Sequence, residues 1–164
     1  MTPEPPATGV VVAVVSGYFN PLHVGHLALM EAAREGADRL VAIVNNDAQQ
    51  RAKKGLQITP EGDRLRMVLA LEVVDEALVS IDDGPGVGDS LRAVRERYPE
   101  ARIVFCNGGD RRTADEVPDH ESRSCAEAGI EMRFGVGGTH KADSSTRILE
   151  ALMQRGEATP PDQD

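Results

Sequence analysis

The sequence predicts an α/β fold, a doubly wound parallel sheet of five strands with helices on both faces. Strand-like and helical segments alternate along nearly the whole chain, and such alternation gives parallel strands joined by right-handed helical crossovers. The strand-like runs at 10–16 and 39–47 are apolar without interruption over 10–15 and 40–44, which is typical of strands buried on both faces. At 164 residues, 40% of them hydrophobic, the chain is long enough for one domain with a substantial core.

The first three elements have clear local signatures. The β-branched run "VVVAVVS" at 10–16 predicts the first strand. The segment "LALMEAAREGA", from residue 27, has apolar residues at helical spacing and predicts a helix that ends near Gly36. The run "RLVAIVNND" at 39–47 predicts the second buried strand.

The central elements continue the alternation. The segment "ITPEGDRLRMVLALEVV" at 58–74 contains a helix, for which we expect Thr59 as the N-cap and Pro60 as the first helical residue. The stretch "EALVSI" at 76–81 predicts a third, short strand. The stretch "DSLRAVRERYP" at 89–99 predicts a helix that its proline ends.

The last elements complete the sheet. The run "ARIVFCN" at 101–107 predicts the fourth strand, and "PDHESRSCAEAG" at 118–129 predicts a helix. The run "IEMRFGV" at 130–136 predicts the fifth strand. The segment "DSSTRILEALMQR" at 143–155 predicts the last helix.

The two ends of the chain differ from its centre in composition. Residues 1–8 contain three prolines, and we expect a disordered tail there. Residues 156–164, "GEATPPDQD", predict a polar C-terminal tail. The stretch 9–155 shows neither a linker nor a repeat, so a single domain is expected over that range.

Composition excludes several classes of protein. The net charge of −9 argues against binding of nucleic acid or of an acidic membrane surface, because both need a basic face. No apolar run approaches the length of a membrane span, about 20 residues. The start "MTPEPPATG" lacks the basic and apolar regions of a signal peptide, and two cysteines do not make a disulfide framework. We therefore expect a cytoplasmic protein with free thiols.

Ligand binding is expected in the loops that follow the strands. In parallel α/β sheets, ligands bind at the carboxyl ends of the strands, near the point where the strand order reverses. The loops at these ends are 16–26, 46–58, 107–118 and 137–146. Two of these loops hold all the lysines of the chain: Lys53, Lys54 and Lys141.

The first of these loops, "GYFNPLHVGH", combines glycine, proline and two histidines. Gly17 permits a tight turn after the strand, and Pro21 fixes the backbone before the helix. Gly25 has no side chain, so a ligand can approach the first helical turn closely. His23 and His26 face the helix N-terminus, where backbone N–H groups and the helix dipole favour anions. Imidazoles there can donate hydrogen bonds to phosphate oxygens and stabilise negative charge that grows at phosphorus.

With this loop, the sequence resembles the HxGH nucleotidyltransferase superfamily, in its cytidylyltransferase-like branch. Three further segments resemble the same branch in the same order: "VVDEALVS" at 73–80, "NGGDR" at 107–111 and "SSTRI" at 144–148. The segment "NGGDR" is similar to the glycine-rich segment of heptose-phosphate adenylyltransferases and glycerol-phosphate cytidylyltransferases. The resemblance extends over about residues 10–150 and implies a Rossmann-like fold.

The resemblance implies a reaction in which a phosphate or phosphonate on a small alcohol or sugar attacks the α-phosphate of a nucleoside triphosphate. Pyrophosphate leaves, and no covalent enzyme intermediate forms. Chain length and the single domain favour transfer of CMP from CTP; "GGD" favours the alternative, ATP-dependent adenylyl transfer to a heptose-type sugar phosphate. Mg²⁺ accompanies the triphosphate, and no protein side chain is assigned to it. A homodimer is implied because the resembling enzymes commonly dimerise.

The resemblance also implies a role for each matching residue. His23 and His26 are expected to bind the α- and β-phosphates and to stabilise the transition state, and Lys54 to close over the phosphates from a mobile loop. The implied nucleotide-binding residues are Gly17, Tyr18, Phe19, Asn20, Gly25, Gly109, Asp110, Arg111, Ser144, Ser145 and Thr146. Further phosphate or acceptor contacts are expected from Lys53, His140, Lys141 and Arg147.

The sequence departs from the branch in three places. The aspartate often present in the first motif is Asn20, and the aromatic residue that often follows "GGD" is Arg111. The stretch "GGTHKADSST" lacks the arginine that many cytidylyltransferases place before the serine/threonine cluster, and we expect His140 or Lys141 to supply the charge. These departures leave the reaction class intact and concern the acceptor and the nucleotide base.

Structural explanations compete with each of these roles. His23 and His26 can form a metal-binding pair or act as helix-cap residues. The stretch "RAKKG" can be a solvated turn, and "SSTR" can be only an N-cap. Asp110 can serve its glycine turn alone, and Arg111 and Arg112 can be surface charges.

Other functions compete as well. A non-catalytic nucleotide-binding module would lose the histidines or the lysine, whereas this chain keeps both. Class I aminoacyl-tRNA synthetases have a signature close to "HVGH", but the chain is too short and too acidic for a tRNA partner. A P-loop enzyme is excluded because GxxxxGK[ST] is absent from the sequence.

Overall fold

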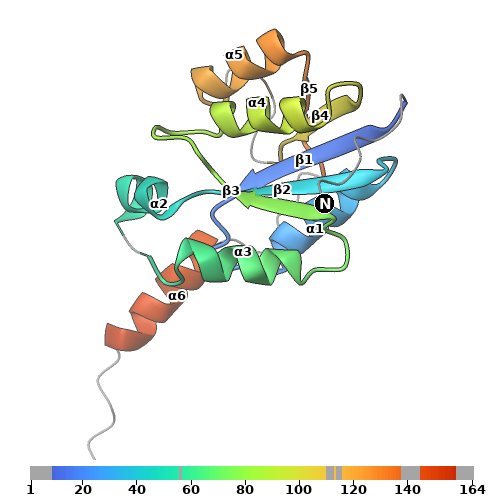
Figure 1. Ribbon diagram of the computed structural model, residues 1–164. Coiled ribbons are helices and arrows are strands. Elements are labelled where there is room, and N and C mark those ends of the chain that lie inside the picture. The colour runs from blue at the N-terminus through green and yellow to red at the C-terminus, as the bar shows by residue number, and fades with distance from the viewer. Residues whose placement is uncertain (1–8, 56, 110–112, 114–115, 138–144, 158–164) are drawn as a thin grey trace, which may run out of the picture.

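The computed structural model describes residues 9–55, 57–109, 113, 116–137 and 145–157 (Figure 1). Strands and helices alternate along the chain, with two helices in succession after the second strand. In order they are β1 (Val11–Gly17), α1 (Val24–Arg34), β2 (Arg39–Val44), α2 (Asp47–Lys54), α3 (Glu61–Leu69), β3 (Glu76–Val79), α4 (Gly88–Arg97), β4 (Arg102–Cys106), α5 (Asp119–Ala128), β5 (Glu131–Arg133) and α6 (Ser145–Glu157).

The described strands form one all-parallel sheet in the order β3-β2-β1-β4-β5. The central strand β1 pairs with β2 in the register Gly17↔Val44 and with β4 in the register Val14↔Phe105. After β3 the chain crosses to the other side of β1, so the strand order reverses between β1 and β4. In such sheets, ligands bind at the carboxyl ends of the strands where the order reverses.

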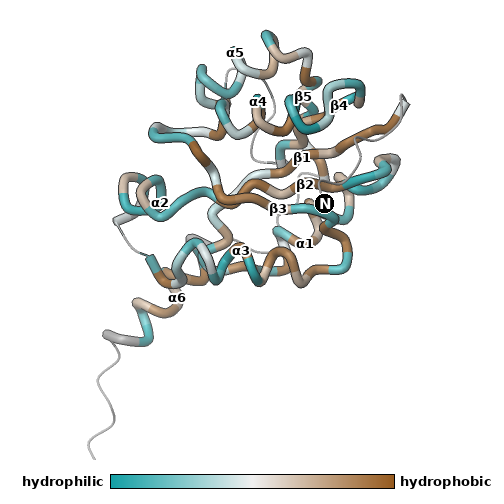
Figure 2. Tube along the Cα trace, viewed as in Figure 1, coloured by the Kyte–Doolittle hydropathy of each residue, from teal (hydrophilic) through white to brown (hydrophobic). Residues whose placement is uncertain are grey.

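Helices cover both faces of the sheet. Figure 1 shows α1 and α3 on one face and α4 and α5 on the other. Val14 lies in the core beneath α4 and α5, with Leu91 and Cys125, whereas its neighbour Val15 lies in the core beneath α1 and α3, with Met30. The brown, apolar strands enclosed between the helices in Figure 2 reflect this burial on both faces. The predicted doubly wound, Rossmann-like α/β fold is confirmed.

Both cysteines belong to the core, in opposite layers. Cys106 packs in the layer of α1 and α3, and Cys125 packs in the layer of α4 and α5. Both thiols are free, as expected. Burial raises the pKa of Cys106 to about 11 and the pKa of Cys125 to about 12, so neither thiol ionises near neutral pH. They act as small apolar side chains.

The segment 46–58, expected as a loop, instead contains the helix α2. The strand β2 ends at Val44, earlier than the predicted 39–47. Asn46 then caps α2: its side chain accepts from the Gln49 N–H at 2.9 Å, and the Gln49 side chain accepts from the Asn46 N–H at 3.0 Å. A reciprocal capping box of this kind marks the N-terminus of a helix, and Asn-x-x-Gln is its signature in the sequence.

Two helices begin at other residues than predicted. The helix α1 begins at Val24 rather than at residue 27, because His23 caps it. The helix α3 begins at Glu61 with Pro60 in the N-cap position, so the assignment of Thr59 as N-cap is wrong. Thr59 instead donates its N–H to the Asn20 side chain.

The outer elements differ in length from the prediction. The strand β5 covers only Glu131–Arg133 of the predicted 130–136, since Gly135 turns the chain with a φ of 65°. The strand β3 ends at Val79. The helix α6 continues to Glu157, two residues past the predicted end at 155. None of the helices among the described residues is long and apolar enough to cross a membrane.

Candidate active site

The loop between β1 and α1 begins with a strained turn. Phe19 has a φ of 52°, in the left-handed region that residues other than glycine rarely adopt. Its ring is buried and lies 3.0 Å from the place where a Cβ on Gly17 would stand. Gly17 therefore leaves room for the Phe19 ring, in addition to the tight turn expected from the sequence. Backbone strain of this kind persists only where the surroundings fix the conformation.

The two histidines of this loop form a capping box at the start of α1. The Gly25 N–H donates to Nδ1 of His23 at 3.0 Å, and the His23 N–H donates to Nδ1 of His26 at 3.3 Å. The two imidazoles stack with their centroids 3.7 Å apart and their planes at 24°. The edge of the Phe19 ring packs against His26 at 4.9 Å between centroids. The strained turn thus helps to orient the imidazole pair.

The capping hydrogen bonds determine which nitrogen of each neutral imidazole carries the proton. Each Nδ1 accepts a backbone N–H, so a neutral ring carries its proton on Nε2. Helix capping uses Nδ1, whereas hydrogen bonding to a phosphate would use the Nε2–H. The helix-cap explanation and the phosphate role of His23 and His26 are therefore compatible, because they use different atoms.

Tyr18 and Asn20, expected near the nucleotide, also bind other loops of the protein. The buried Asn20 accepts from the N–H groups of Ile58 and Thr59 at 3.0 and 3.1 Å. The carbonyl oxygen of Tyr18 accepts from Arg64 at 2.7 Å. Asn20 therefore joins the histidine loop to the connection between α2 and α3.

Helix α2 is anchored at its N-terminus on two sides. Asn46 and Gln49 donate from their side-chain amides to four carbonyl oxygens of the β3–α4 loop, at 2.8–3.1 Å. The accepting residues are Ser80, Asp82, Gly84 and Gly86. On the other side, the Asp47 N–H donates to Glu61, and the Glu61 N–H donates to Asp47.

The last turn of α2 carries the two lysines expected at the phosphates. Lys53 places its ammonium 4.6 Å from the centre of the Tyr18 ring, in cation–π geometry. Lys54 is the last residue of the helix, and Gly55 ends it in the left-handed conformation, with a φ of 64°. The mobile loop that the sequence implied for Lys54 is thus the end of a helix, beside the histidine loop.

Arg64 is a part of this region that sequence reasoning missed. It is the largest fully buried side chain among the described residues, and its guanidinium bonds the carbonyl oxygens of Tyr18 and Asn45. It also pairs with Asp47 at 2.7 Å. A signal existed in the sequence: Arg64 stands four residues before the buried Val68, so a charged residue occupies the apolar stripe of a helix.

The remaining predicted residues lie at the ends of other elements or outside the described residues. Gly25 lies in the first turn of α1, Gly109 follows β4, and Arg147 is exposed on α6. Ser145 and Thr146 begin α6. The residues outside the described part of the chain are Asp110, Arg111, Arg112, His140, Lys141 and Ser144.

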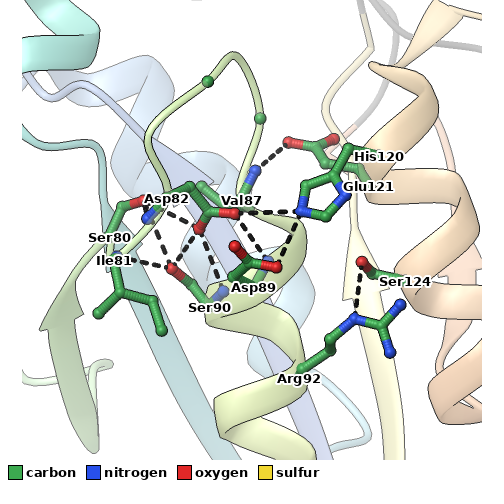
Figure 3. Close-up of polar contacts among 12 residues, drawn as sticks. Ser80, Ile81, Asp82, Val87, Asp89, Ser90, Arg92, His120, Glu121 and Ser124 are labelled. Atoms are coloured by element: carbon green, nitrogen blue, oxygen red, sulfur yellow. Dashed lines mark hydrogen bonds and ion pairs between the residues drawn. The ribbon is translucent and has the colours of Figure 1, made fainter.

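A second polar group lies between the β3–α4 loop and α5 (Figure 3). The buried Asp82 accepts from the N–H groups of Asp89 at 2.7 Å and Ser90 at 3.1 Å, so it caps α4. His120 Nε2 lies 3.0 Å from Oδ1 of Asp89 and 3.6 Å from Oδ1 of Asp82. In the described part of the chain these three residues are the group whose ligand atoms are close enough to hold one metal ion. His23 and His26 do not belong to it, so the metal-pair explanation for them gains no support.

The arrangement at the carboxyl end of β1 suits a polyanion. Two imidazoles, a helix N-terminus and the lysine-bearing end of α2 lie around one loop. All of these groups donate hydrogen bonds or carry positive charge, which is what phosphates bind.

Known proteins are similar to the chain over most of its length. The sequence model of the family described as cytidylyltransferase-like matches residues 14–151. The chain belongs to the cytidylyltransferase-like family. The match includes the histidine loop, α2, Arg64 and the first turns of α6.

Individual members of the family are moderately similar to the chain. The Bifunctional protein HldE of Methylococcus capsulatus is 33% identical over 143 residues, which are 86% of this chain and 28% of that protein. The protein of the same name from Rhodopseudomonas palustris (strain BisA53) is 35% identical over 154 residues, 93% of this chain and 29% of that protein. The chain thus spans less than a third of the length of these relatives.

Among solved structures, the lipopolysaccharide core biosynthesis protein of Thermoplasma volcanium GSS1 is similar to the chain. It superposes with a TM-score of 0.58 and 25% identity, over 77% of this chain and 94% of that protein. The fold, and the nucleotidyltransferase family that the sequence indicated, are therefore both supported.

Proposed function

We propose that the protein transfers AMP from ATP to the phosphate of a heptose-type sugar, with release of pyrophosphate. An oxygen of the sugar phosphate forms a bond to the α-phosphorus of ATP. The bond from that phosphorus to the oxygen bridging the α- and β-phosphates breaks, and its electron pair leaves with pyrophosphate. No covalent bond to the protein is required.

The imidazole pair at the start of α1 is the observation that carries this proposal. Nδ1 of His23 and of His26 accepts a backbone N–H, so each ring in its neutral form has its proton on Nε2. Two preorganised donors at a helix N-terminus stabilise the negative charge that develops on the α- and β-phosphates. They need no reorientation when the charge develops, which is the source of their catalytic effect.

The names of the relatives favour adenylyl transfer over the CMP transfer that chain length suggested. The relatives are HldE proteins, which supports the heptose-phosphate adenylyltransferase alternative rather than a cytidylyltransferase. The neighbour from Thermoplasma volcanium is described as a lipopolysaccharide core biosynthesis protein, which is consistent with a sugar substrate. We therefore take ATP as the donor and treat CTP as the alternative to be tested.

Lysines at the end of α2 are proposed to neutralise the outer phosphates. Lys53 lies against Tyr18 in the histidine loop, and Lys54 follows it in the same turn. Mg²⁺ is proposed to arrive as part of the Mg·ATP substrate, held mainly by phosphates and water. A homodimer is a further proposal, which light scattering can test.

A ligand panel and a turnover assay test the proposal. Thermal unfolding is followed with Mg²⁺ and each of ATP, CTP, GTP and UTP at about 100 times the dissociation constant, where a bound nucleotide adds about 2.7 kcal/mol. Pyrophosphate release is then measured with sugar 1-phosphates, including a heptose phosphate, and with glycerol phosphate. Stabilisation by ATP together with release from the sugar phosphates supports the proposal.

Two other outcomes would overturn it in different ways. Stabilisation and turnover with CTP alone would restore the cytidylyl alternative. Stabilisation by a nucleotide without pyrophosphate release from any acceptor would favour a non-catalytic binding module.

A further inference from the structure

Arg64 brings a buried positive charge into contact with four acceptors, which lie in three segments of the chain. Its Nε donates to the carbonyl oxygen of Thr59 at 2.8 Å. One terminal nitrogen donates to the carbonyl oxygens of Tyr18 and Asn45, both at 2.7 Å, and the other donates to Oδ1 of Asp47 at 2.7 Å. The side chain has no exposed surface.

The acceptors lie around the region that is proposed to bind phosphate. Tyr18 lies in the histidine loop, Asn45 follows β2, Asp47 begins α2, and Thr59 lies between α2 and α3. Stability alone does not explain such a residue, because a buried ion pair is often no more stabilising than apolar side chains of similar volume. What a planar guanidinium adds is geometry, since its donors point in fixed directions in one plane.

The contacts continue from Arg64 to the groups that are proposed to bind phosphate. Arg64 donates to the carbonyl oxygen of Tyr18, and the ammonium of Lys53 lies over the ring of the same tyrosine. The next residue, Phe19, has the strained φ of 52° and packs its ring against His26. On the other side, Arg64 holds Asp47 at the first turn of α2, whose last turn carries Lys53.

We propose that Arg64 is a positioning residue for nucleotidyl transfer, which sets the spacing between the imidazole pair and the lysine-bearing helix α2. The guanidinium does not touch substrate; it holds the histidine loop and α2 to one rigid unit. This inference rests on the proposed function, because it concerns the same triphosphate site. Displacement of a catalytic group by about 1 Å can lower a rate about 100-fold, so a loss of this spacing is visible in turnover.

Arg64→Lys removes the planar set of guanidinium donors while it keeps the positive charge. A lysine has one nitrogen at the end of a flexible chain and cannot reach four acceptors in four directions. We expect kcat/KM for Mg·ATP to fall about 100-fold in this variant. The fall includes kcat, because the imidazoles and the lysines no longer meet the phosphates together.

Arg95 provides a matched control at the other edge of the sheet. Its guanidinium also holds carbonyl oxygens, those of Ala128 and Ala101 at 2.8 Å and that of Gly129 at 2.9 Å. These groups precede β4 and β5, at the amino ends of the strands, whereas the histidine loop follows the carboxyl end of β1. Arg95→Lys should therefore lower stability but leave kcat/KM within about twofold of wild type.

The experiment compares the two variants with wild type at a temperature at which circular dichroism shows all three folded. The kinetic constants for Mg·ATP are measured by pyrophosphate release, at saturating concentration of the best sugar phosphate. A large loss of kcat in Arg64→Lys alone supports the proposal. Wild-type kinetics in Arg64→Lys, or equal losses in both variants, would overturn it and leave Arg64 with a structural role only.

A second pair of variants decides the matter if Arg64→Lys does not fold. Asp47→Ala releases α2 from Arg64, whereas Asp47→Asn keeps an oxygen that can accept the same hydrogen bond. Loss of turnover in Asp47→Ala with rescue by Asp47→Asn supports the proposal, and equal kinetics of the two variants would overturn it. Failure of the proposed function is distinct, because wild type itself would then release no pyrophosphate from ATP with a sugar phosphate.

Discussion

Replacement of His23 by asparagine should separate the two roles of this histidine. Nδ1 of His23 accepts the Gly25 N–H at 3.0 Å and caps α1, whereas the Nε2–H is proposed to bind phosphate. Asparagine is among the best N-cap residues, so His23→Asn keeps an acceptor for the helix and loses the imidazole. His23→Ala loses both.

The magnitudes of the two losses differ and are measured separately. Loss of the cap in His23→Ala costs about 1 kcal/mol of unfolding free energy, which lowers the melting temperature by about 2–4 °C in a chain of this size. Loss of one transition-state donor costs about 2.7–4 kcal/mol in activation free energy, a decrease in kcat of about 100- to 1000-fold. His23→Asn should therefore melt close to wild type and lose turnover as fully as His23→Ala.

The assay pairs thermal unfolding with coupled detection of pyrophosphate. If His23→Asn turns over at close to the wild-type rate, the reasoning is refuted, and His23 is a helix-cap residue only. If His23→Asn melts as early as His23→Ala, the capping geometry does not support α1 as described.

Further predictions concern other parts of the molecule. Lys54→Ala should raise KM for the nucleotide with almost no change in melting temperature; a large loss of stability would make this lysine structural. Burial of Glu76 would by itself raise its pKa, but hydrogen bonds from Arg97 and Tyr98 outweigh burial and lower the pKa from the ordinary 4.5. Glu76 therefore stabilises the fold above pH 4.5 and loses this contribution as the pH falls, so unfolding curves of wild type and Glu76→Gln should converge in acid; a constant difference would contradict this. Gly88→Ala should destabilise by about 1–3 kcal/mol, because a Cβ there would lie 2.5 Å from the His120 ring; unchanged denaturant unfolding would refute this contact.

Local sequence patterns were sufficient to predict a sheet covered by helices on both faces. The apolar runs around Val14 and Ile43 predicted strands buried on both faces, because such strands need no polar residues at alternate positions. Alternation with helices then required parallel strands and crossovers, and the observed order β3-β2-β1-β4-β5 follows that rule. The helix α2 was missed although its capping box at Asn46 and Gln49 was readable, because a charged, glycine-flanked segment resembles a loop.

The sequence by itself indicated the family, because the loop with His23 and His26 and three later segments resemble it in the same order. It also placed the two histidines at the start of a helix that follows a buried strand. It did not determine how these residues are held. The buried position of Arg64, its pairing with Asp47 and the strained backbone of Phe19 arise where segments up to 46 residues apart in the chain meet. Only the tertiary structure decides such contacts, because the acceptors of Arg64 include backbone carbonyl groups, which every residue carries and no sequence pattern marks.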